Sequence, residues 1–255
     1  MLTRSLIAIS FLLPLCLGCA SVTLKESSPE APDTSTEPAP SAPFSVDGQH
    51  RYSADIVPLS YRVELTIDPR EERFSGQVEI EIDIKALNEG RVVLHGQNMT
   101  VHVASIRHGD TRLDATVETG PNGSLWLETT PPPPPGKATL YLAFDAPLPR
   151  VPEGLYRTQE GDAWYAFTQF EPLEARKAFP CFDQPEFKTP FSFRVTVPRG
   201  MSALANTPEL SRQDAGEMTV FEFGTSKPLP TYLVAFAVGD FDIVSAPPGR
   251  FPSGL

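Results

Sequence analysis

The feature that most constrains the fold is a strict two-residue alternation of apolar and polar side chains in residues 74–84. The apolar set consists of Val78, Ile80, Ile82 and Ile84. Successive side chains of a β-strand point to opposite faces, so this period predicts a strand with one buried and one solvated face. Residues 61–68 alternate in the same way, and residues 69–73 predict a hairpin connection between the two strands.

Short strand patterns separated by turn residues continue along the chain, and an amphipathic helix of ordinary length is not found. The further predicted strands are residues 91–95, 99–107, 111–117, 124–128, 138–144, 191–197, 202–206, 209–213, 219–223 and 232–240. This spacing predicts an all-β fold, an antiparallel sandwich or a pair of curved sheets. One very short helix is expected near residues 173–178, just before Pro180.

The composition is that of a globular protein, and the net charge bears on which partners the protein can bind. The chain has 255 residues, of which 40% are hydrophobic and 21% charged, enough for one large β domain. Its formal net charge is −11. Nucleic-acid binding requires a basic surface, so the charge argues against a nucleic-acid partner.

The N-terminal residues predict where the protein is located in the cell, not how it folds. Residues 1–18 carry Arg4 and an apolar run too short to span a bilayer, which is typical of a signal peptide. Its end, Gly18-Cys19, resembles a bacterial lipobox in which the Cys19 thiol carries a lipid, although Cys16 departs from the pattern. The alternative is ordinary cleavage after Ala20.

Residues 19–46 are rich in Pro, Ser, Thr and acidic side chains and predict a disordered tether, because they cannot bury enough apolar surface to fold. The expected location is extracytoplasmic, with a lipid anchor in a bacterial membrane. A secreted or periplasmic protein is the alternative.

The most distinctive stretch runs from Trp164 to Phe193. Residues 164–171 alternate as a strand, with Gln169 and Glu171 on one face, and Pro172 is expected to end it because proline lacks an N–H for the ladder. A second strand is predicted from Phe187, with Phe187, Phe191, Phe193 and Val195 on one face. Cys181 lies between two phenylalanines, which favours a buried, unreactive thiol.

Residues 168–185 resemble a characteristic block of the aminopeptidase N family, the zinc aminopeptidases with an HExxH site. The matching residues are Thr168-Gln169-Phe170-Glu171-Pro172, then Ala175-Arg176, then Ala178-Phe179-Pro180-Cys181-Phe182-Asp183 and Pro185. The resemblance extends more weakly from Ile56 to Gly239. It implies the saddle-shaped N-terminal β domain of that family over residues 47–245. Residues 246–255 are then expected to begin a linker, with the catalytic domain absent from the chain.

The resemblance also implies the functional residues. It assigns substrate binding to Gln169 and Glu171, which reach into the catalytic cleft in the family, and it makes Glu171 the ligand of a peptide N-terminus. The four histidines, His50, His95, His102 and His108, form no HExxH motif, and His102 and His108 fit solvent-facing strand positions better than a metal site. We therefore expect no catalytic residue, no metal ligand and no cofactor in this chain, and one zinc in the missing catalytic domain.

Two functions remain open from the sequence. The first is the substrate-recognition domain of a zinc aminopeptidase that removes N-terminal residues from peptides, inactive when alone. The alternative is a non-enzymatic, lipid-tethered β module that binds peptides or a partner subunit.

Overall fold

The computed structural model describes residues 55–87 and 90–244. The chain divides into two units, residues 1–41 and 42–255, and every described residue belongs to the second unit. The predicted signal peptide, the lipid attachment at Cys19, the tether of residues 19–46 and the linker of residues 246–255 therefore lie outside the described residues.

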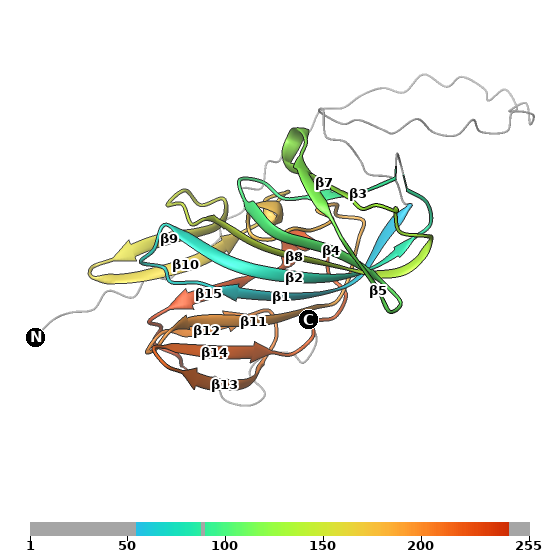
Figure 1. Cartoon of the computed structure of the whole chain (residues 1–255). Coiled ribbons are helices and arrows are strands. Elements are labelled where there is room, and N and C mark those ends of the chain that lie inside the picture. The colour runs from blue at the N-terminus through green and yellow to red at the C-terminus, as the bar shows by residue number, and fades with distance from the viewer. Residues whose placement is uncertain (1–54, 88–89, 245–255) are drawn as a thin grey trace, which may run out of the picture. The chain divides into compact units, whose positions relative to one another are not determined.

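The largest element is an eight-stranded sheet of long strands (Figure 1). Its order is β13-β14-β11-β1-β2-β8-β4-β5. The strands are β1 (Ile56–Thr66), β2 (Arg73–Ile84), β4 (Thr100–His108), β5 (Thr111–Asp114), β8 (Gly136–Pro147), β11 (Phe191–Pro198), β13 (Glu209–Ala215) and β14 (Met218–Phe223). Neighbours pair antiparallel except β1 and β11, which run parallel and join Tyr61 to Phe191 in register.

Two smaller antiparallel sheets complete the fold. One has the order β12-β15-β10-β9 and the other β3-β7-β6. Their strands are β12 (Ser202–Ala205), β15 (Phe236–Gly239), β10 (Ala163–Gln169), β9 (Gly154–Glu160), β3 (Arg91–His95), β7 (Ser124–Glu128) and β6 (Thr116–Thr119). The helical elements among the described residues are the 3-10 turns η1 (Pro121–Gly123), η2 (Ala175–Lys177) and η3 (Thr231–Leu233).

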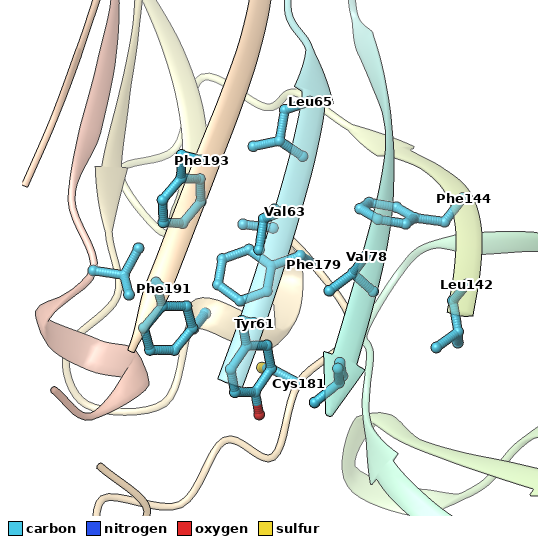
Figure 2. Close-up of a cluster of buried hydrophobic side chains, with 14 of the residues drawn as sticks. Tyr61, Val63, Leu65, Val78, Leu142, Phe144, Phe179, Cys181, Phe191 and Phe193 are labelled. Carbon is cyan, nitrogen blue, oxygen red and sulfur yellow. The ribbon is translucent and has the colours of Figure 1, made fainter. Parts of the chain in front are cut away.

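The core forms where the alternation of the sequence predicts it. Val78, Ile80 and Ile82 are completely buried, whereas Glu79 and Glu81 between them are exposed. Figure 2 shows Val63 and Leu65 of β1 packing beside Val78 and Phe144, with Phe179, Phe191 and Phe193 on the other side of the same cluster. The all-β prediction is confirmed, and none of the helices among residues 55–87 and 90–244 is long and apolar enough to cross a membrane.

Several predicted elements differ in detail from the structure. The predicted strand 111–117 is two strands, because Ala115 donates its N–H to the Ala104 carbonyl and the chain then passes from the eight-stranded sheet to the three-stranded one. The expected short helix is only the 3-10 turn η2. The last predicted strand, residues 232–240, begins inside η3 and forms a strand only over β15. Phe187 precedes β11 and packs edge-on against Phe182, so it is not part of the strand.

Candidate functional site

The two predicted substrate-binding residues lie together at the end of β10. β10 ends at Gln169, two residues earlier than predicted, so Glu171 is not on the strand face as expected. The chain turns because Phe170 is buried against Phe179 and Phe236, and its carbonyl accepts the Glu174 N–H at 2.8 Å. Both Gln169 and Glu171 remain exposed.

A contact across this turn keeps the two residues adjacent. The Gln169 side-chain amide donates to the Glu171 carbonyl oxygen at 3.5 Å. Across the ladder, Gln169 pairs with Gly154, whose φ of +69° is in the region that favours glycine. A Cβ on Gly154 would lie 2.7 Å from the Lys177 Cβ, so the absence of a side chain there lets the turn approach β9 closely.

A buried ion pair anchors the segment that follows. The Arg176 Nε lies 2.9 Å from the Asp183 Oδ2, and the two side chains are 9% and 0% exposed. The guanidinium also donates to the Asp183 carbonyl and to the Asn122 carbonyl. Thr231 donates its hydroxyl to the Asp183 Oδ1 at 2.6 Å. A buried charge pair is tolerated when its remaining hydrogen-bonding positions are filled, as they are here.

His95 and Cys181 tie the same segment to β3. Each residue donates its backbone N–H to the carbonyl of the other, and the Asp183 N–H donates to the His95 Nδ1 at 3.1 Å. Burial, and next the Arg176 guanidinium, lower the His95 pKa from 6.5 to about 3, so the ring is neutral. Cys181 is buried as predicted, and that burial raises the pKa of its thiol.

Tyr61 holds the segment from the side of the eight-stranded sheet. Its hydroxyl accepts the Phe182 N–H at 3.0 Å, and its ring stacks on Phe191 with the centroids 4.5 Å apart. Figure 2 shows Cys181 beside Tyr61 in the buried cluster. The segment that follows Gln169 and Glu171 is thus attached to β1 of the eight-stranded sheet and to β3 of the three-stranded sheet. These attachments support the two exposed residues.

The rim of the site is charged. The Lys177 ammonium lies 2.8 Å from the Glu153 carboxylate and 2.5 Å from the Glu174 carboxylate. Burial lowers the Lys177 pKa, but the hydrogen bonds to the two carboxylates raise it by more, so the net shift is upward. Ion pairing accounts for Glu174 and for Arg176, as expected, and Glu171 is left outside these pairs.

Nothing in the described part of the chain gathers metal ligands. Groups of three or more His, Cys, Asp or Glu side chains able to hold a metal ion are not found among residues 55–87 and 90–244. His102 and His108 both lie on β4, where His102 is exposed and contacts the Asp145 carboxylate. The described residues therefore do not fit a zinc ion.

One hollow of about 330 Å³ lies at the other end of the β9–β10 hairpin. It is lined by Arg150, Arg157, Thr158, Gln159 and Gly161. Arg150 and Arg157 stack on the Trp164 ring at 4.6 and 4.9 Å from its centroid. Neither Gln169 nor Glu171 contributes to this hollow.

Sequence reasoning missed the buried network of His95, Arg176, Asp183 and Thr231. His95 falls on the face of β3 that alternation assigns to solvent, in phase with Arg91 and Val93. The signal that was available is the close spacing of Arg176 and Asp183 within the distinctive block. The burial of His95 depends on Cys181, which arrives from a distant part of the chain.

Three sheets, mainly antiparallel, carry an exposed pair of polar residues, Gln169 and Glu171, at the end of one strand. Residues 57–233 match the Peptidase M1 N-terminal domain. The chain belongs to the peptidase M1 family through this domain, and the resemblance found in the sequence is confirmed.

The relatives are aminopeptidases that are much longer than the match. Aminopeptidase M1-D of Oryza sativa subsp. japonica is 32% identical over 201 residues, which cover 77% of this chain and 23% of the relative. Aminopeptidase M1 of Arabidopsis thaliana is 32% identical over 208 residues, with coverage of 77% and 23%. Endoplasmic reticulum aminopeptidase 1 of Rattus norvegicus is 28% identical over 248 residues, with coverage of 91% and 27%. The chain thus spans about a quarter of the length of these relatives.

Proposed function

We propose that this domain recognises the N-terminus of peptide substrates in a zinc-dependent aminopeptidase. The observation that carries the proposal is the adjacency of Gln169 and Glu171 at the exposed end of β10, in a block that matches the family. Zinc, held by a catalytic domain, would supply the activated water for peptide hydrolysis. This domain would supply binding and orientation.

Glu171 is assigned the substrate's α-ammonium group. It is an exposed carboxylate that takes part in neither of the Lys177 ion pairs at the rim. A second domain placed over it would desolvate the carboxylate, and a desolvated charge is stable only with an opposite charge beside it. A free peptide N-terminus meets that need, whereas an acetylated N-terminus does not.

Gln169 is assigned the first side chain of the substrate. It is the last residue of β10, two residues before Glu171, and its side-chain amide donates to the Glu171 carbonyl. A neutral amide can donate and accept without demanding a charge. Replacing it should therefore change the preference among first residues more than the need for a free amine.

The function is tested in a fusion that joins residues 20–255 to the part of Arabidopsis thaliana aminopeptidase M1 that follows its matched segment. We expect cleavage of peptides with a free N-terminus and a large loss with acetylated ones. Gln169→Ala should reorder the kcat/KM values among first residues while keeping the discrimination against acetylation. A fusion that cleaves acetylated and free peptides equally well would refute the proposal.

We also propose that the protein is lipid-anchored outside the cytoplasm through Cys19. The support is the run of apolar residues before Gly18-Cys19 and the Pro- and Ser-rich stretch behind it. On this view the β domain works on peptides at a bacterial membrane surface. Secretion without a lipid is the alternative, and it differs in the fate of the Cys19 thiol.

A further inference from the structure

The small sheet β12-β15-β10-β9 has two unlike faces. Its inner face is buried in the core through Leu155, Ala166, Ala203 and Val238. Its outer face is defined here as Leu204, Ala237, Phe167, Tyr156, Tyr165 and Phe241. The first four form one row across the strands, because Leu204 pairs with Ala237, Ala237 with Phe167, and Phe167 with Tyr156.

The rings of the outer face pack on one another rather than under other elements. Phe167 lies 6.1 Å from Tyr156 and 6.2 Å from Tyr165, measured between ring centroids. Phe241 lies 5.4 Å from Tyr165 and 6.0 Å from Phe167. All four rings are only half-buried, and Leu204 at the end of the row is 43% exposed.

This face is also poor in charge. Within the four described strands, the residues that share the parity of Phe167 are Gly154, Tyr156, Thr158, Glu160, Ala163, Tyr165, Gln169, Ser202, Leu204, Ala237 and Gly239. Glu160 is the one charged residue in this set, in a chain of which 21% is charged. Aromatic enrichment with depletion of charge characterises the centre of protein interfaces.

We infer that the outer face is the surface on which the catalytic part of the aminopeptidase docks; this inference rests on the proposed function. The face continues directly into the candidate site, because Gln169 is the next residue on the same face of β10 after Phe167 and Glu171 follows it. Substrate residues of this domain can act only where a catalytic domain borders them. The uncharged aromatic row beside them fits that border.

The end of the described chain supports the same occupant. Phe241 packs on the outer face, and the Tyr165 hydroxyl donates to the Asp240 carbonyl. Ile243 and Val244 then follow, 57% and 90% exposed. In relatives of which the matched segment is 23%, polypeptide beyond the matched region is available to cover these side chains. Figure 1 shows β9 and β10 projecting as a hairpin, with β15 alongside β10.

The test uses the fusion of residues 20–255 described above. Leu204→Glu places a charge on the outer face at an edge strand, and Phe167→Glu does so at its centre. Leu210→Glu is the matched control, because Leu210 is 71% exposed on β13, the edge strand of the eight-stranded sheet. Thermal unfolding of the unfused variants verifies that Leu204→Glu and Leu210→Glu leave the fold intact.

The readout is the rate at which a protease cuts the junction of the fusion. We expect the unsubstituted and Leu210→Glu junctions to resist cleavage, and the Leu204→Glu and Phe167→Glu junctions to be cut about tenfold faster, because cleavage follows the population of the undocked form. Equal rates in all four fusions would overturn the inference. So would a dimer of the unfused chain that Leu204→Glu dissociates, because the face would then bind a second copy.

The outcome separates this inference from the proposed function. If the junction is protected through the outer face but peptides with free and acetylated N-termini are cleaved equally, the docking surface stands and the substrate role fails. If the fusion discriminates between these peptides but the Leu204→Glu junction is no more sensitive than that of Leu210→Glu, the substrate role stands and the docking surface is wrong.

Discussion

The Arg176 guanidinium and the Asp183 carboxylate form a buried ion pair with their Nε and Oδ2 atoms 2.9 Å apart. Both residues lie in the segment that follows Gln169 and Glu171, and the pair is completed by the Asn122 carbonyl and the Thr231 hydroxyl. A buried polar network therefore belongs to the segment that follows the candidate site. The Arg176–Asp183 pair fixes the backbone of the segment that follows the two exposed residues.

Breaking this pair should be costly. Arg176→Ala leaves the Asp183 carboxylate buried without its counter-charge, and the expected loss in the free energy of unfolding is about 3–5 kcal/mol. The control is Arg70→Ala, which breaks an exposed pair with Asp68 and should cost less than about 1 kcal/mol. Urea denaturation of both variants measures the difference. Equal small losses would mean that the buried pair does not stabilise the segment.

His95 should make the fold sensitive to acid. Its pKa is about 3 in the fold, whereas an exposed histidine titrates near 6.5. Between these values the unfolded chain binds more protons, so the free energy of unfolding should fall as the pH drops below about 6.5, by up to about 1.4 kcal/mol per pH unit.

The control for this effect is His95→Asn, which keeps a side-chain acceptor for the Asp183 N–H but has no proton to bind. Urea denaturation at several pH values between 6.5 and 4 gives the two slopes. The wild-type slope should be the steeper of the two. Identical slopes would show that His95 does not remain neutral in the fold.

The outer face requires a glycine at position 239. The Tyr165 ring lies directly over Gly239, and a Cβ at this position would overlap it. Gly239→Ala should displace the ring and cost about 1–3 kcal/mol, as expected for overpacking. Gly224→Ala is the matched control, since its nearest neighbour would be at 3.7 Å and its loss should stay under about 1 kcal/mol. Thermal unfolding and the tyrosine near-ultraviolet circular dichroism signal report both effects.

The lipid anchor makes a prediction about location. Cys19→Ser removes the thiol that would carry the lipid, so the protein should move from the membrane fraction to the soluble extracytoplasmic fraction with an unchanged β domain. Fractionation of cells expressing each form, with circular dichroism of the released protein, measures this. Cys16→Ser is the control and should remain in the membrane fraction. A wild-type protein that is already soluble after cleavage would rule out the anchor.

Local patterns in the sequence predicted most of the strands, although not β9, and they could not predict which distant strands pair. The alternation from Val78 to Ile84 identified β2 and its buried face, because period and burial are local properties. The parallel pairing of β1 with β11 could not be derived, since it joins Tyr61 to Phe191 across more than a hundred residues. Nothing in either strand alone specifies that partner.

The candidate site shows the same division. The block around Gln169 and Glu171 was identified by resemblance, but Glu171 was placed on the strand face, two residues beyond the true end of β10. Alternation continues through Phe170, but that ring packs on Phe179 and Phe236 and its carbonyl accepts the Glu174 N–H, so the chain turns. His95 was missed for a similar reason, since Cys181 covers a position that its own strand leaves open.

The substrate role of Glu171 is the central claim, and the most direct test is kcat/KM for free-amine peptides in the fusion described above. Glu171→Ala should lower kcat/KM by an amount that corresponds to about 2–4 kcal/mol of transition-state stabilisation. This is the range for leaving one half of a desolvated charge pair unpaired. Acetylated peptides should lose little further. Glu118→Ala, on an exposed carboxylate of β6, is the control and should leave kcat/KM unchanged. If Glu171→Ala stays within about twofold of wild type, roughly 0.4 kcal/mol, Glu171 does not bind the substrate's α-ammonium.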